Sequence, residues 1–132
     1  MQVLFYSSDS NKTFDDLISQ VKGIVENNKI FFFTRLDHFT LWLKRPGEKN
    51  IGSIAILHPK DEEELESILN VKHMLNELRL ILILPDRNDE TVSKGHKLRP
   101  RFLTFQDNDY KEVYAVIEKM SASTNPKKKA AA

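Results

Sequence analysis

Five short apolar runs recur along the chain, separated by longer and more polar segments. They cover residues 3–6 (VLFY), 30–33 (IFFF), 54–57 (IAIL), 80–84 (LILIL) and 102–105 (FLTF). None alternates regularly between apolar and polar positions, as a strand with one face in water would. Continuous apolar strands are typical of a parallel sheet covered by helices on both faces. The runs therefore predict five such strands, with Phe31, Phe32 and Phe33 in the core.

The segments after the runs show the apolar spacing of helices. This spacing predicts helices within residues 13–27, 37–44, 61–78, 89–98 and 107–120, the fourth being weak because it is short and contains Gly95. A strand followed by a helix, five times over, favours a three-layer α/β/α sandwich with a five-stranded parallel sheet of order 2-1-3-4-5, the flavodoxin-like arrangement. We expect one domain over residues 1–121 and a disordered tail over 122–132, which is native or partly a remnant of cloning.

The composition excludes several classes of function. The chain has 132 residues with 20 Lys or Arg and 19 Asp or Glu, so its formal net charge is +1. A general nucleic-acid or membrane-surface binder would show a large basic excess, and we expect neither partner. The absence of cysteine excludes disulfides, thiolate catalysis and Cys-ligated zinc. No run is long enough to span a bilayer and the opening residues, MQVLFYSS, are unlike a secretory signal, so we expect a cytoplasmic protein.

The five strand–helix units, opening on VLFYSSDS and closing on EVYAVIEKM, give the chain a family resemblance. Over residues 2–120 it resembles the receiver domain of bacterial two-component response regulators. Receivers place two acidic residues after the first strand to help hold Mg²⁺ and a phosphoryl-accepting aspartate at the end of the third. A Thr or Ser ends the fourth strand and a lysine the fifth. The carboxylate is the nucleophile, and the cations and hydroxyl bind the charged phosphoryl group.

This chain departs from the receiver pattern at every one of those places. Ser7 and Ser8 stand where the acidic pair would lie, and Asp9 is the nearest carboxylate. Hydroxyls are poor Mg²⁺ ligands compared with carboxylates. The other strand ends carry His58 (or Leu57, if the register slips by one), Leu84 with Pro85, and Phe105 with Gln106. The resemblance therefore implies a degenerate receiver without a phosphoacceptor, a metal ion, a cofactor or catalytic residues.

His58, at the end of the third predicted strand, could be a phosphoryl acceptor, a metal ligand or a general base. A histidine in this position more often caps the edge of the core and hydrogen-bonds to a loop, which is the interpretation we prefer. The competing function is a small-ligand or enzymatic domain that uses the crevice at the carboxyl ends of the strands. Its polar residues would be Ser7, Ser8, Asp9, His58, Asp86 and Gln106, which form no recognisable catalytic set.

Residues 85–102, PDRNDETVSKGHKLRPRF, are unusually rich in cations. The candidates for partner binding are Arg87, Lys94, His96, Lys97, Arg99 and Arg101. In receivers this region, the fourth helix and fifth strand, commonly docks a protein partner or a second copy. A basic face suits an acidic protein surface or a phosphate group, although charge runs often serve only solvation. The function we expect is a non-phosphorylatable, receiver-like interaction module in bacterial signalling or regulation, with a protein partner or as a homodimer.

Overall fold

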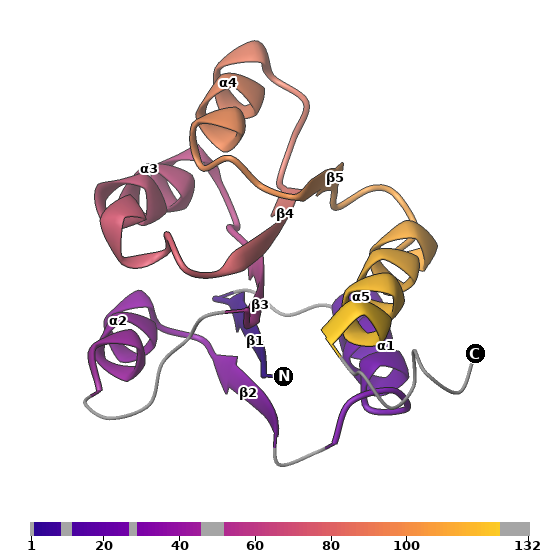
Figure 1. Cartoon of the computed structure of the whole chain (residues 1–132). Helices are drawn as coiled ribbons and strands as arrows, with labels where there is room; N and C mark the ends of the chain where they lie inside the picture. Colours follow the sequence, from indigo (N-terminus) through magenta and orange to yellow (C-terminus); the bar gives the residue numbers. More distant parts are fainter. Residues whose placement is uncertain (1, 9–11, 27–28, 46–51, 125–132) are drawn as a thin grey trace.

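The structure, a computed structural model, describes residues 2–8, 12–26, 29–45 and 52–124. All strand pairs in the sheet are parallel, and the strand order is β2-β1-β3-β4-β5. The predicted fold class is therefore confirmed. In Figure 1, α1 and α5 cover one face of this sheet, and α2, α3 and α4 cover the other. In chain order the elements are β1 (Val3–Ser7), α1 (Lys12–Val21), β2 (Ile30–Phe33), α2 (Leu36–Lys44), β3 (Ile54–His58), α3 (Glu62–Asn70), β4 (Arg79–Leu84), α4 (Asp89–Lys97), β5 (Phe102–Phe105) and α5 (Lys111–Thr124).

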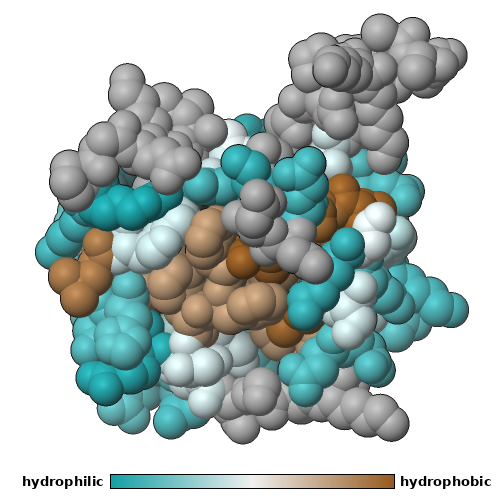
Figure 2. Space-filling view, turned by 90° about the horizontal axis from the view of Figure 1, so that it is seen from below, coloured by the Kyte–Doolittle hydropathy of each residue, from teal (hydrophilic) through white to brown (hydrophobic). Residues whose placement is uncertain are grey.

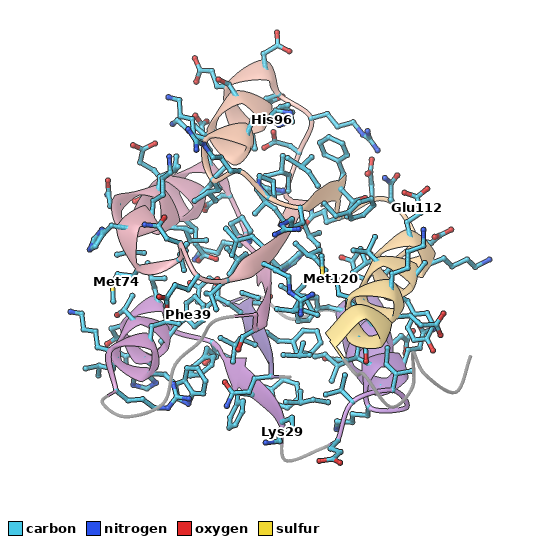
Figure 3. The ribbon with its side chains drawn as sticks, viewed as in Figure 1. Lys29, Phe39, Met74, His96, Glu112 and Met120 are labelled. Carbon is cyan, nitrogen blue, oxygen red and sulfur yellow. The ribbon has the colours of Figure 1, made fainter. Side chains whose placement is uncertain are left out.

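The three central strands β1, β3 and β4 are buried on both faces, which explains their unbroken apolar sequence. Successive side chains point to opposite faces of a strand, so each apolar run contributes residues to the hydrophobic cores on both faces of the sheet. In Figure 3 the labelled Phe39 of α2 and Met120 of α5 lie on opposite sides of the sheet. The core under α1 and α5 takes Val3, Phe5, Ile54, Ile56, Ile81 and Ile83 from these strands. The core under α2, α3 and α4 takes Leu4, Tyr6, Ala55, Leu57, Leu80, Leu82 and Leu84.

β2 is an edge strand, and its aromatic run is only partly buried. Phe31 and Phe33 pack on Trp42 of α2, with ring centroids 5.0 and 5.9 Å apart. Phe32 stacks on Phe5 at 5.6 Å but stays 50% exposed. Figure 2 shows an apolar area bordered by hydrophilic residues on the side of the molecule where β2 lies. The prediction that all three phenylalanines belong to the core is wrong for Phe32, because one side of an edge strand has no neighbouring strand.

All five helices differ from their predicted bounds. α1 begins one residue before residue 13 and ends at Val21, six residues before residue 27, and α4 ends one residue before residue 98. α3 ends at Asn70 and is followed by a short 3₁₀ helix, η2 (Lys72–Met74), although the chain as far as residue 78 still buries leucines. α2 begins one residue earlier than predicted, so Asp37 lies in its first turn, where its carboxylate pairs with Arg35 at 2.8 Å. α5 starts four residues later than predicted and continues past the expected domain boundary at 121, where Ser121 is still buried.

The rest of the expected tail, residues 125–132, lies outside the described residues. None of the helices in the described ranges has the length and apolar character needed to span a membrane.

Candidate functional sites

The carboxyl ends of β1 and β3 bring Ser7 and His58 together. These two residues are partners in the parallel register of the two strands. The Ser7 hydroxyl and His58 Nδ1 are 2.9 Å apart and share a hydrogen bond, whose direction depends on the imidazole tautomer. A hydroxyl and an imidazole therefore stand where a receiver places an acidic residue and its phosphoryl acceptor.

The Ser7–His58 pair is buried. Ser7 is 5% exposed and His58 is 1% exposed. The ring of Phe14, on α1, stacks on the imidazole with centroids 5.2 Å apart and 29° between the planes. A nucleophile and base can act only on a substrate that reaches them. This burial favours the interpretation of His58 as a hydrogen-bonded cap on the edge of the core.

The remaining crevice candidates make hydrogen bonds that lead away from this pair. The Ser8 hydroxyl donates to Glu64 on α3 at 2.6 Å. Asp86 accepts the backbone N–H of Asn88 in its own loop at 2.9 Å. Gln106 is exposed, and its backbone N–H donates to the carbonyl of Leu84 at 2.9 Å. Asp9 lies outside the described residues.

A pocket that the sequence did not reveal lies beside these strand ends, between α2 and α3. Its volume is about 280 Å³, and its lining includes Tyr6, Leu36, Lys60 and Glu64. Burial, together with the charges of Glu64 and Asp37 and a hydrogen bond to Glu64, raises the pKa of Tyr6 to about 12. The sequence signal was the position of Tyr6, one residue before the end of a buried strand, where alternation turns its side chain towards α2 and α3.

Within the described part of the chain, no cluster of three or more histidine or carboxylate side chains is placed to hold a metal ion. Two acidic side chains at the start of α3 accept backbone N–H groups of the same segment. Asp61 accepts the backbone N–H of Glu64 as the helix N-cap, at 2.8 Å, and Glu64 accepts the backbone N–H of Lys60 at 3.2 Å.

Two of the six basic candidates on the α4–β5 side are held by intramolecular contacts. Arg87 donates to Asp107 at 2.9 Å and to Asn108 at 3.0 Å, and its guanidinium lies 4.1 Å from the centroid of the Phe105 ring. Lys94 bridges two carboxylates of α3, at 2.8 Å from Glu62 and 3.0 Å from Glu66.

Hydrogen bonds to these two carboxylates raise the pKa of Lys94 to about 12. Lys94 thus links α4 to α3 through these two ion pairs.

The other four candidates lie at the end of α4 and in the loop to β5. His96, which Figure 3 labels on α4, is exposed, and so are Lys97, Arg99 and Arg101. None of Lys97, Arg99 and Arg101 forms an ion pair with a carboxylate of the described residues. The basic segment therefore divides into a part whose charges are paired within the fold and a part whose charges form no ion pair with the described carboxylates.

Gly95 explains why the weak fourth helix sits firmly on the sheet. A Cβ atom at this position would lie 3.1 Å from the Leu82 side chain and 3.2 Å from the Leu84 side chain. The glycine that interrupts the helical pattern therefore allows α4 to approach β4 closely. This contact fixes the position of the basic residues that follow the helix.

No protein-family model matches the chain, and no curated protein sequence matches it. Among solved structures, the chain is similar to a pilus assembly-related protein from Burkholderia pseudomallei, with a TM-score of 0.64 over 92% of this chain and 90% of that one. The two sequences are 14% identical, so the similarity shows a common fold and does not transfer an activity. The five-stranded parallel sheet of this chain is consistent with a receiver-like topology.

Proposed function

We propose that this chain is a receiver-like module without a phosphorylation site, which binds a protein partner in bacterial signalling or regulation and catalyses no reaction. One observation carries the proposal: the buried Ser7–His58 pair occupies the ends of β1 and β3, where a receiver needs carboxylates. The ends of β4 and β5 are Leu84 and Phe105, which can neither donate to a phosphoryl group nor neutralise its charge.

The proposed docking face is the end of α4 together with the α4–β5 loop. Lys97, Arg99 and Arg101 are exposed there without carboxylate partners among the described residues. Exposed charges contribute little to stability, so a group of them without partners is available to an acidic surface at little cost. The bacterial structural neighbour, which is named for pilus assembly, supports a bacterial setting for this module.

Affinity capture from the lysate of the native cell tests the docking face. The test variant carries Lys97→Glu, Arg99→Glu and Arg101→Glu. The control carries Lys44→Glu, Lys111→Glu and Lys119→Glu, which reverse the same number of exposed charges on α2 and α5. We expect the wild type and the control to capture the same proteins and the test variant to lose them, with all three unfolding at similar temperatures. Equal capture by the two variants would remove the case for this face.

A second experiment tests the absence of phosphoryl chemistry. Beryllofluoride or acetyl phosphate with Mg²⁺ is added while amide shifts are followed by NMR. We expect no saturable shift at Ser7, His58 or Gln106, because His58 stands at the end of β3 where a receiver has its acceptor aspartate and Gln106 follows β5 where a receiver has its lysine. Saturable, Mg²⁺-dependent shifts at these amides would overturn the proposal.

The pocket beside Tyr6 favours a second candidate, a small-ligand domain. Its volume of about 280 Å³ and its carboxylates fit a small organic cation. Screening of small amines by NMR would favour this candidate if shifts gathered on Tyr6 and Glu64.

A further inference from the structure

A second pocket lies at the other end of the strands, near the amino end of β4. It has a volume of about 350 Å³, and residues of two connections that are far apart in the sequence line it. The α3–β4 connection contributes Lys72, Leu75 and Leu78, and the end of α4 contributes Leu98 and Arg99. The leucines are between 2% and 8% exposed, so only small parts of their side chains reach the floor of the pocket, beside the polar side chains of the rim. Lys72 and Arg99 bring positive charge to the rim.

Positive charge is concentrated around this pocket. Residues 72–80 and 96–101 carry five Lys or Arg residues and one acidic residue, Glu77, whereas the whole chain is nearly neutral. Neither Lys72 nor Arg99 forms an ion pair with a carboxylate of the described residues. Burial lowers the pKa of Arg79, and the nearby charge of Arg101 lowers it further; this second cause agrees with a positive potential at this end of the sheet. The charge of the rim therefore complements an anionic ligand.

The backbone gives an independent reason to look at Arg99. Its φ is +54°, and it is the one non-glycine residue with positive φ in the described ranges. Its N–H donates to the carbonyl of His96 at 3.0 Å, so it occupies the position just after the α4 C-cap, where glycine is favoured. An arginine here strains the backbone in a way that glycine would relieve. Strained residues cluster at binding and active sites, so this conformation makes Arg99 a candidate for recognition.

We propose that this pocket binds a short segment of a partner protein that carries a carboxylate next to a large apolar side chain. The apolar side chain enters the pocket against Leu75 and Leu98, and the carboxylate pairs with Arg99 and Lys72. A free phosphate would use only the rim, whereas this occupant also uses the leucine floor. The inference rests on the proposed function, since it names the partner chemistry and extends the docking face from the α4–β5 loop to η2.

Selection from random octapeptides displayed on phage tests the proposal. The full chain and its Arg99→Gly variant are used as separate targets. We expect the wild type to enrich peptides with Asp or Glu close to Leu, Ile or Phe, and the variant to enrich no such motif. Because glycine suits the backbone at this position, we expect the Tm of Arg99→Gly to be raised by about 3 °C or unchanged. Loss of binding would then not reflect unfolding.

Affinities of the enriched peptide complete the test. We expect Arg99→Gly and Lys72→Gln each to raise its Kd by about tenfold or more, as expected for loss of a charge-assisted hydrogen bond. The control, Lys111→Gln on the exposed side of α5, should leave the Kd unchanged. Selection of no motif, a motif without an acid, or equal affinities would overturn the proposal. So would displacement of the peptide by inorganic phosphate beyond that produced by chloride of equal ionic strength, because the site would then be a simple anion site.

The two proposals can fail separately. If the triple charge reversal abolishes partner capture but no acidic peptide binds the pocket, the docking face stands and the pocket inference falls. If capture survives the charge reversal while the peptide requires Arg99 and Lys72, the pocket stands and the wider docking function falls.

Discussion

The hydrogen bond between Ser7 and His58 can be measured with a double-mutant cycle. The cycle compares the wild type with Ser7→Ala, His58→Leu and the double variant. The two side-chain atoms are 2.9 Å apart, and both residues are buried. Removing one partner leaves a buried polar group without this hydrogen bond, which costs about 1–3 kcal/mol of unfolding free energy.

The expected magnitude follows from this burial. Ser7→Ala should lower the unfolding free energy by about 1–2 kcal/mol, because it removes only the hydroxyl. His58→Leu should cost about 2–4 kcal/mol, since it also loses the ring contact with Phe14. The double variant should be more stable than the sum of the single losses implies, by a coupling energy of about 1–2 kcal/mol, because neither polar group then remains without its partner.

Urea unfolding followed by circular dichroism and by tryptophan fluorescence gives the four free energies. Trp42 is the only tryptophan and packs on Phe31 and Phe33, so its emission reports on the α2–β2 side of the fold. The m-value should be the same in all four proteins, which keeps the cycle interpretable. A coupling energy below about 0.3 kcal/mol would refute the reasoning that the pair caps the core edge.

Three further changes test buried or perturbed groups. Thr91 is fully buried, and its hydroxyl has no hydrogen-bond partner in the described ranges, so Thr91→Val should raise the unfolding free energy in urea by about 1 kcal/mol; a loss of stability would reveal a partner for the hydroxyl. The Tyr110 hydroxyl is also buried without such a partner, so Tyr110→Phe should leave the Tm unchanged or higher, and a lower Tm would contradict this. Tyr6 has its pKa raised from 10.0 to about 12, so the native state holds this proton more tightly than the unfolded chain does. The resulting stability should be complete below pH 10 and fall as the pH rises towards 12, and in Tyr6→Phe the fall should be smaller; equal falls in urea titrations across that range would count against the assignment.

The sequence was sufficient to predict the fold because a strand buried on both faces has an unbroken run of apolar residues. The apolar runs that end at Leu57, Leu84 and Phe105 fixed the strands to within a residue, and His58 completes the third of them. The same kind of apolar run gave the wrong prediction for Phe32, which is half exposed. An aromatic run looks alike in a central strand and at an edge, and only the packing of α1 and α5 decides how much of the ring is covered.

The candidate sites were less predictable because their partners are distant in the sequence. Lys94 pairs with Glu62, and Arg87 pairs with Asp107, across 32 and 20 residues. A run of basic residues does not show which of them are neutralised within the fold. The pocket between η2 and the end of α4 could not be predicted either, because its lining residues are far apart in the sequence. The positive φ of Arg99 was also unpredictable, because a residue before proline ordinarily has an extended backbone.

The open edge of β2 has a practical consequence for every titration suggested above. Among the described residues, β2 is hydrogen-bonded only to β1, so its outer backbone groups can accept a strand from another molecule, and the exposed ring of Phe32 lies beside them. Edge-to-edge joining would strengthen with protein concentration, whereas binding of an acidic peptide would weaken with salt. Dilution series and salt series run in parallel will therefore separate self-association along β2 from recognition at the basic end of the sheet.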